Sequence, residues 1–225
     1  MSNQEKIELI KPYSLFKVDT YLAQLSFLHD SGLAKNIAYN LHFLAFLRQM
    51  WLSTNIKFSI EKSVFKVKII TLGSVMEAII HDVLKFQIAS GKIKFQKQWK
   101  ITNKSISWQY TDAKDSIERK FSAAIEELLD EKFTDHSDLF WLIELAKTNG
   151  IIDDSLAFQC HRLREYRNTV HTKVLDQWEM LYYTAEKVDH AKECVQHLFT
   201  LFSPNHDEGL LNILYSSTVA DETKR

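Results

Sequence analysis

Residues 163–171 of this chain read Leu163-Arg164-Glu165-Tyr166-Arg167-Asn168-Thr169-Val170-His171. In a helix each residue is rotated by about 100° from the one before it, so offsets of three, four and seven return to one face. Arg164, Arg167, Asn168 and His171 are related by these offsets. The pattern predicts a helix with one face that carries two guanidinium groups, an amide and an imidazole.

An apolar stripe borders this polar face. Its members stand at offsets of seven, fourteen and eighteen along the chain: Leu156, Leu163, Val170 and Val174. Arg167 and His171 project from the edge of the stripe rather than from the opposite side of the helix. Charged groups beside a core need a partner or a function, and an ion pair with an acid is the ordinary structural explanation.

The segment resembles the signature of HEPN domains (higher eukaryotes and prokaryotes nucleotide-binding), in which an arginine precedes a histidine by four to six intervening residues. Six residues separate Arg164 from His171, whereas three separate Arg167 from His171. The resemblance therefore assigns the motif arginine to Arg164. Arg167 and Asn168 match the Arg-Asn pair that the family often carries.

The surrounding sequence is also similar to this family. Residues 139–146 predict a helix that Asn149 and Gly150 end, and Asp153, Asp154 and Ser155 are N-cap candidates for the motif helix. Upstream, residues 72–80 resemble the first long helix of the family, with Glu77 as the single acid in an apolar run. Downstream, residues 184–202 supply a fourth helix. The resemblance covers roughly residues 62–204.

Composition favours helices over a large sheet. The chain has 225 residues with only five glycines and two prolines, whereas a multi-stranded protein needs many turns. We predict an all-α fold: an up-and-down helical bundle of HEPN type with an N-terminal helical hairpin and a small inserted β-hairpin.

Cys160 and Cys194 stand in apolar helical registers and are interpreted as reduced core residues. The histidine spacings indicate no metal site, and we expect no cofactor.

Charge and hydropathy limit the binding partners and the cellular location that we expect for the protein. A formal net charge of −1 excludes a globally basic nucleic-acid binder but leaves a local basic patch open. The first eleven residues contain no signal-peptide hydrophobic region. The most apolar stretch, residues 41–52, is shorter than the roughly 20 residues that span a bilayer. We expect a cytoplasmic protein without a membrane contact.

Three regions are predicted along the chain. Residues 1–60 form an N-terminal helical extension, with helices at 18–30 and 33–53 separated by Asp30-Ser31-Gly32. Residues 61–204 form the HEPN-like domain, which begins with a long helix over 61–90. The polar residues 205–225 form a C-terminal tail that we expect to be mobile.

In residues 92–110 the apolar residues no longer recur with a helical period but alternate with polar ones, as in a strand. We predict a β-hairpin there, with a turn at 102–105 and Trp99 opposite Trp108. Five lysines and no acid lie in this segment: Lys92, Lys94, Lys97, Lys100 and Lys104. Lysines between aromatics are typical of single-stranded nucleic-acid surfaces, so these are candidate RNA contacts. The ordinary alternative is a hairpin that buries its aromatic face. Residues 114–130 predict a further amphipathic helix.

The resemblance implies a reaction. In catalytic HEPN proteins two motif helices meet across a homodimer interface, and their Arg and His side chains cleave RNA without a metal. His171 would take a proton from a ribose 2′-hydroxyl, and the arginines would stabilise charge on the phosphate, leaving a 2′,3′-cyclic phosphate. Asn168 would orient these groups. Acids must balance the arginines of a symmetric dimer, and Glu77 and Glu165 are the candidates.

Two other interpretations stay open. A non-catalytic HEPN-like dimeric scaffold, or a nucleotide- or RNA-binding module, would use Arg167 and His171 only to pair with acids. An all-helical interaction protein would instead depend on aromatic residues such as Trp51, Trp141 and Trp178. A toxin would also have an antitoxin partner. Lys173 stands where the branch paired with a nucleotidyltransferase antitoxin has a modified tyrosine, which disfavours that branch.

Overall fold

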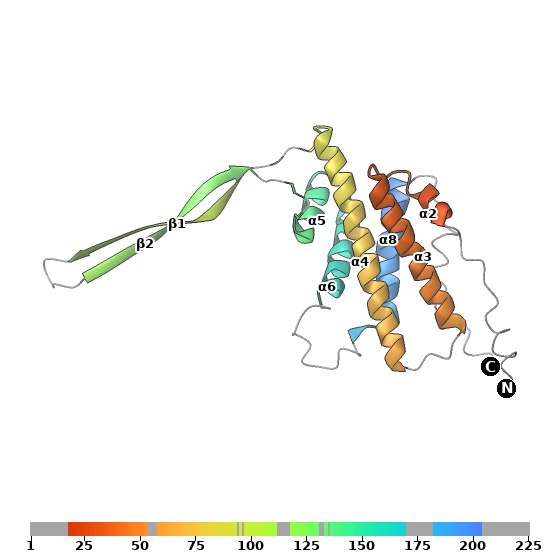
Figure 1. The fold of residues 1–225 in the computed structure, drawn as a ribbon. Coiled ribbons are helices and arrows are strands. Elements are labelled where there is room, and N and C mark those ends of the chain that lie inside the picture. The colour runs from red at the N-terminus through yellow and green to blue at the C-terminus, as the bar shows by residue number, and fades with distance from the viewer. Residues whose placement is uncertain are drawn as a thin grey trace. The chain divides into compact units, whose positions relative to one another are not determined.

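The computed structural model describes residues 18–53, 58–93, 95, 97–111, 118–130, 133–134, 136–169 and 182–203. The described chain is mostly helical, with one two-stranded antiparallel sheet (Figure 1). It divides into two compact units. Met1–Gln87 together with Ser137–Arg225 delimits the first unit, which contains the helical bundle, and Ile88–His136 delimits the second, which contains the sheet.

The helices begin and end close to the predicted positions. Two glycines with positive φ, Gly91 and Gly150, follow the ends of the helices at 58–89 and 139–148, as their conformational freedom allows. In chain order the helices are α2 Val18–Gln24, α3 Ser31–Ser53, α4 Phe58–Ala89, α5 Leu139–Thr148, α6 Asp154–Asn168 and α8 Ala185–Phe202. The helix predicted at 18–30 is shorter than expected, because residues 25–27 form a turn.

Helix α4 is the centre of the bundle (Figure 1). It runs through the first unit with α5 and α6 drawn on one side and α2 and α3 on the other. Its residues Leu72, Met76 and Ile79 are almost fully buried. Cys160 of α6 and Cys194 of α8 are both buried and free, with their sulfur atoms 3.6 Å apart. The two cysteines are therefore core residues where α6 meets α8, as predicted.

The carboxylate of Asp82 ties the turn between α2 and α3 to α4. Its Oδ2 accepts a hydrogen bond from the backbone N–H of His29 at 2.9 Å, and its Oδ1 accepts one from that of Asp30 at 3.2 Å. The His29 ring lies 3.2 Å from Oδ2 through Nδ1 and stacks on Phe86, with ring centroids 3.6 Å apart. The predicted N-terminal extension thus shares one compact unit with α4.

The predicted β-hairpin is wrong in its turn and its register. The strands are β1 Lys97–Thr111 and β2 Glu118–Asp130, so the chain continues as one strand through the expected turn at 102–105. That stretch instead contains a register shift between Ile101 and Ser105. Trp99 pairs with Leu128, and Trp108 pairs with Phe121, rather than with each other.

The predicted helix over 114–130 is also wrong, since β2 occupies most of it. Phe121, Ile125 and Leu128 fit a helical face, but Phe121, Ala123 and Ile125 equally fit one face of a strand. β1 offers a ladder of backbone partners from Lys97 to Thr111. Pairing with that ladder overrides the helical propensity of a segment rich in Ala, Glu and Leu.

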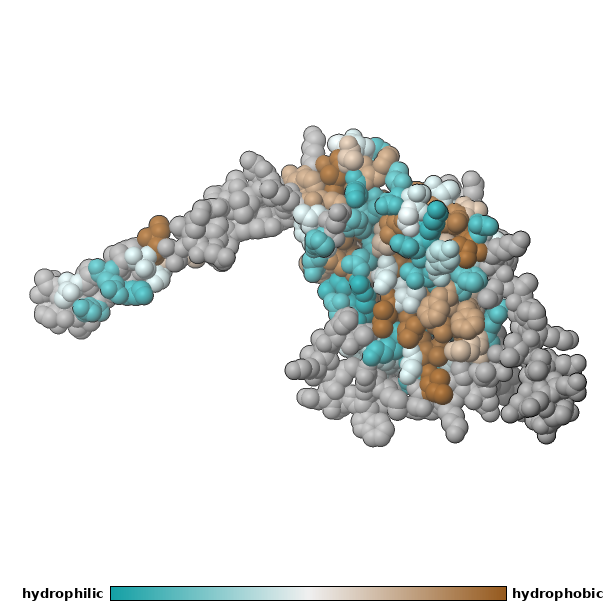
Figure 2. All heavy atoms as spheres, in the orientation of Figure 1, coloured by the Kyte–Doolittle hydropathy of each residue, from teal (hydrophilic) through white to brown (hydrophobic). Residues whose placement is uncertain are grey.

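No helix within the described part of the chain is long and apolar enough to cross a membrane. The longest, α4, has 32 residues but carries buried charged side chains, among them Lys68 and Asp82. Exposed apolar side chains are present as well, and Figure 2 shows them mixed with polar ones over α3 and α4. On α3 they include Tyr39, Phe43 and Phe46.

Candidate functional site

Helix α6 carries three of the four predicted motif residues. It begins after Asp153, whose carboxylate accepts a hydrogen bond from the backbone N–H of Leu156 at 2.7 Å and so caps the helix. It ends at Asn168, with Thr169 as the C-cap. Leu156 and Leu163 of the predicted stripe are buried. Val170, His171 and Val174 lie outside the described residues.

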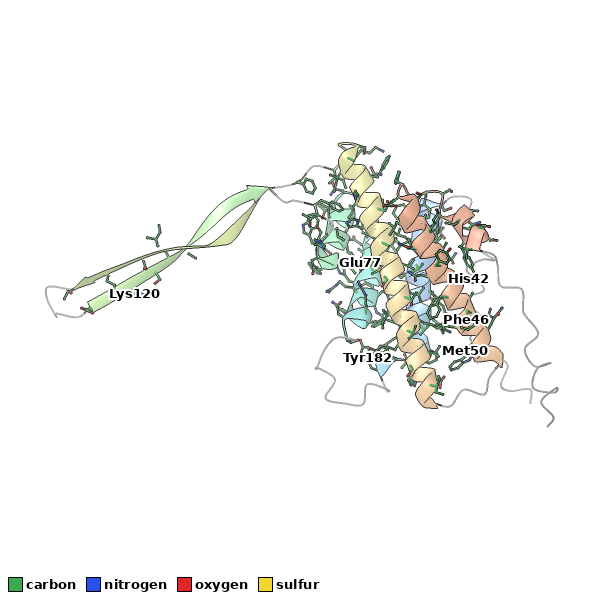
Figure 3. All side chains as sticks on the ribbon, in the orientation of Figure 1. His42, Phe46, Met50, Glu77, Lys120 and Tyr182 are labelled. Carbon is green, nitrogen blue, oxygen red and sulfur yellow. The ribbon has the colours of Figure 1, made fainter. Side chains whose placement is uncertain are left out.

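Arg167 forms an ion pair with Glu77 of α4, ninety residues away in the sequence. The side chains are 28% and 34% exposed, so the pair is partly buried. The aliphatic stem of Arg167 lies against Gly73, one turn before Glu77, where a Cβ atom would approach its Cδ to 3.0 Å and its Cβ to 3.3 Å. Gly73 therefore allows the close approach that brings Arg167 to Glu77. Figure 3 labels Glu77 on the central helix α4.

Arg164 points to a different neighbour. Its guanidinium carbon lies 5.2 Å from the centre of the Phe140 ring of α5, within the range of a cation–π interaction. Its Nε is buried and has no hydrogen-bond partner. Arg164 and Arg167 thus share a helix face, but their side chains engage α5 and α4 respectively. The two guanidinium groups are separately held rather than paired around one point.

The ring of His161 adds a polar group next to Arg164 that the motif did not include. His161 is one turn before Arg164, and its Nε2 lies 2.7 Å from Oε1 of Glu144 on α5. The ring also packs on Phe140, with centroids 5.0 Å apart. The offset of three from Arg164 was the only sequence signal for this position, because the partner Glu144 belongs to another helix.

The remaining predicted site residues are more exposed or lie elsewhere. Glu165 and Asn168 are exposed on α6. Glu165 was the second candidate acid for balancing the arginines. Among the described residues, however, Glu77 is the acid that forms an ion pair with a motif arginine. His171, the predicted acid–base residue, lies outside the described residues. The structure thus brings Glu77 to Arg167, and it places Arg164 and Asn168 on the same helix as Arg167.

The predicted basic segment belongs to the second compact unit. Lys92 is exposed and precedes β1, and Lys94 lies outside the described residues. Three lysines are on β1: Lys97, Lys100 and Lys104. In the register of the sheet Lys97 is opposite Asp130, and Lys100 is opposite Glu127. The register does not decide between RNA contacts and an ordinary hairpin for these lysines, so both interpretations stay predictions.

Gly73→Ala is expected to destabilise the protein by about 1 kcal/mol. Alanine is the better helix former by about 1 kcal/mol, but forcing a methyl group against a packed neighbour costs about 1–3 kcal/mol. The new Cβ would meet the stem of Arg167. Urea unfolding of the two proteins measures the difference.

The double variant Gly73→Ala/Arg167→Ala is the control for this contact. Removing Cγ and Cδ of Arg167 relieves most of the crowding, so Gly73→Ala should cost less in that background. An increase in stability for the single variant Gly73→Ala would show that Arg167 moves aside freely. The close approach of α4 and α6 would then not depend on glycine.

A pocket lies between α6 and α8 and was missed from the sequence. Its volume is about 190 Å³, and its polar lining includes Arg162, Tyr166, His190 and Glu193. Arg162 donates a hydrogen bond to the hydroxyl oxygen of Tyr166 at 2.8 Å. These side chains come from helices that meet only in the folded protein, so sequence spacing could not group them.

Among the residues that the structure describes, no three His, Cys, Asp or Glu side chains lie close enough together to hold a metal ion. Comparison with known proteins gives no match, since no family model, no curated protein and no solved structure is significantly similar to this chain.

Proposed function

We propose that this chain is a HEPN-like protein that cleaves RNA without a metal, at a site formed where two copies of the C-terminal end of α6 meet in a homodimer. The ion pair between Arg167 and Glu77 carries the proposal. It joins the two segments that the family resemblance singles out, the motif helix and the single acid of the long apolar helix. The two residues are ninety positions apart in the sequence, so only the folded bundle brings them together.

The pair gives Arg167 a fixed position at the end of the helix. Arg167 stands in the last turn of α6, four residues before His171. Glu77 holds one guanidinium nitrogen, Nη1, and so orients the group while balancing its charge. In a symmetric dimer this balance matters, because Arg164 and Arg167 of both copies would otherwise bring four positive charges together.

The reaction follows from these groups. His171 takes the proton of a ribose 2′-hydroxyl, whose oxygen attacks the adjacent phosphorus. The bond from phosphorus to the 5′-oxygen breaks, and His171 of the second copy gives that oxygen a proton. Arg164 and Arg167 stabilise the charge on the phosphate. The products are a 2′,3′-cyclic phosphate and a free 5′-hydroxyl, and the stoichiometry requires no metal.

A non-catalytic HEPN-like scaffold is the second candidate. The observation that favours it is that both arginines already have partners in their own chain, Arg167 in Glu77 and Arg164 in the Phe140 ring. Side chains engaged in this way are typical of helix packing, and such a pair often has only a structural role. A scaffold would keep these contacts and lack cleavage.

The wild-type protein is expected to cleave single-stranded RNA in the presence of EDTA. His171→Ala and Arg164→Ala should each lower the cleavage rate by at least about 100-fold, the usual scale for removing one acid–base or charge-stabilising group. Glu77→Gln should lower it less, because it removes only the orientation of Arg167. Product analysis should find the 2′,3′-cyclic phosphate.

Two variants on the same helices serve as matched controls. Arg162→Ala removes an arginine of α6 that is bonded to Tyr166 rather than to Glu77 or Phe140, and His197→Ala removes an exposed histidine of α8 bonded to Gln159. Both should cleave like the wild type. Equal cleavage by wild type and His171→Ala would reject the nuclease proposal. A dimer without any cleavage would support the scaffold.

A further inference from the structure

The two cysteines of the chain touch each other in the core of the bundle. Cys160 of α6 and Cys194 of α8 stand 34 positions apart and are the only cysteines in the sequence. Their sulfur atoms lie 3.6 Å apart, and both side chains are 0% exposed. A separation of this size is direct contact between two sulfur atoms, so no other atom lies between the thiols.

The distance between the sulfur atoms is short enough for a bond to form without moving the helices. A disulfide bond is about 2.05 Å long, so the two sulfur atoms must approach each other by about 1.5 Å in total. Small rotations about the two Cα–Cβ bonds supply such a shift. Met76 of α4 lies on the other side of Cys194, with its Sδ 3.8 Å from Sγ. Its flexible thioether can follow the shift and keep the core filled.

Burial affects the thiols and a disulfide in different ways. The hydrogen bond with Cys160, and then burial, raise the pKa of the Cys194 thiol well above its usual value. The thiolate is the reactive form, so the thiols react slowly while they are buried. A disulfide has no charge, and the apolar core does not disfavour it. Burial therefore slows oxidation of the pair but does not oppose the product.

We propose that Cys160 and Cys194 are a redox-sensitive pair, which oxidised glutathione or a similar small disulfide converts to a disulfide bond between α6 and α8. One cysteine attacks the glutathione disulfide as its thiolate, which gives a mixed disulfide and releases one reduced glutathione. The other cysteine attacks the mixed disulfide and releases the second. Two electrons pass to oxidised glutathione, and the two thiol protons end on the two glutathione thiols.

Access to the pair requires a transient opening of the contact between α6 and α8, because both cysteines are fully buried. The pocket of about 190 Å³ lies between the same two helices. Two residues of its lining, Gln159 and Glu193, directly precede Cys160 and Cys194 in the sequence. The two helices therefore do not fill the space between them along their whole length, and we expect opening to begin there.

The disulfide adds a covalent link to the helix that carries the motif arginines. Arg164 and Arg167 stand four and seven residues after Cys160 and engage α5 and α4. The bond fixes α6 to α8 as well, so its expected effect is on the stability and opening of the bundle. The inference does not rest on the proposed RNA cleavage, because it needs only the two thiols and their contact.

Counting free thiols after oxidation tests the proposal. The full-length protein is reduced, freed of reductant and incubated overnight with about 5 mM oxidised glutathione at about pH 8, both without urea and with about 1 M urea to promote local opening. It is then unfolded and treated with N-ethylmaleimide. Intact mass should show the loss of two hydrogen atoms, no bound glutathione and no maleimide adduct, whereas the reduced protein carries two adducts. Dithiothreitol should restore both thiols.

Thermal unfolding shows whether the bond suits the folded structure. The Tm of the oxidised protein should exceed that of the reduced protein by at least about 5 °C, because a cross-link restricts the unfolded chain. Cys160→Ala and Cys194→Ala each keep one thiol, so the same treatment should give neither a disulfide within the chain nor this rise. The comparison of oxidised with reduced wild type holds even where a variant fails to fold.

Four results would each overturn the proposal. They are two free thiols after both incubations, a stable glutathione adduct in place of the disulfide, chains linked to one another on a non-reducing gel, and a lower Tm in the oxidised protein. The last of these would show that the bond strains the contact between α6 and α8.

Discussion

Asp82→Ala is expected to lower the free energy of unfolding by about 3 kcal/mol. The carboxylate is 4% exposed and accepts hydrogen bonds from the backbone N–H groups of His29 and Asp30. A hydrogen bond to a charged group contributes about 1.5–3 kcal/mol, and removing the acceptor leaves both donors without it in a partly buried turn. Urea unfolding followed by circular dichroism measures the loss.

His29→Ala separates the backbone contacts from the side-chain contact. This variant removes the ring that stacks on Phe86 and faces Oδ2 of Asp82, but leaves both backbone N–H groups bonded to the carboxylate. It should cost clearly less than Asp82→Ala. A cost as large as that of Asp82→Ala would show that the stacked ring, rather than the carboxylate, holds the α2–α3 turn against α4.

Lys68→Met is expected to raise the free energy of unfolding by about 3 kcal/mol at pH 7. The pKa of Lys68 falls from 10.5 to about 8 on folding, and a difference of this size corresponds to about 3 kcal/mol of penalty on the protonated form. Methionine keeps most of the apolar stem and has no charge to bury. Replacing buried charges by apolar side chains of similar volume often stabilises a protein.

The gain from Lys68→Met should depend on pH in a defined direction. Below about pH 8 Lys68 is protonated in both states, so the penalty is complete. Between about pH 8 and 10.5 the unfolded chain binds the proton more strongly, so the stability of the wild type rises with pH and the difference shrinks. Unfolding at pH 7 and pH 10 measures it. A difference that is constant with pH would contradict the lowered pKa.

The sequence predicted the helices better than the sheet, for a physical reason. α5 has local signals at both ends and α6 has one at its start: the carboxylates of Asp138 and Asp153 cap the first turns, and Gly150 follows the end of α5. The strand β2 has no such signal. Its residues fit a helix and a strand equally, and only the partner strand β1 decides between them.

The candidate site was predictable only in part. The helical offsets correctly placed Arg164, Arg167 and Asn168 on α6, because that relation is local. The partner of Arg164 was not predictable, since Phe140 belongs to another helix and its aromatic ring gives no charge signal. Glu77 was identifiable as a lone acid in an apolar run. The close contact between Gly73 and Arg167 could be recognised only from the folded structure.

A small pocket lined by Arg48 of α3, Lys68 of α4 and Lys192 of α8 shows the same limit. The three residues are separated by 20 and 124 positions in the sequence. No short motif can join residues at such distances. Their convergence follows from the packing of α3, α4 and α8.

The position of α4 also sets the order in which its contacts become available during synthesis. Asp82 meets His29 and Asp30, which precede it by 53 and 52 residues, so these contacts can form as soon as α4 has left the ribosome. Glu77 must wait for Arg167, ninety residues later. In a nascent chain the acid on α4 therefore has no Arg167 to pair with until α6 has been made, whereas both backbone partners of Asp82 have already been synthesised.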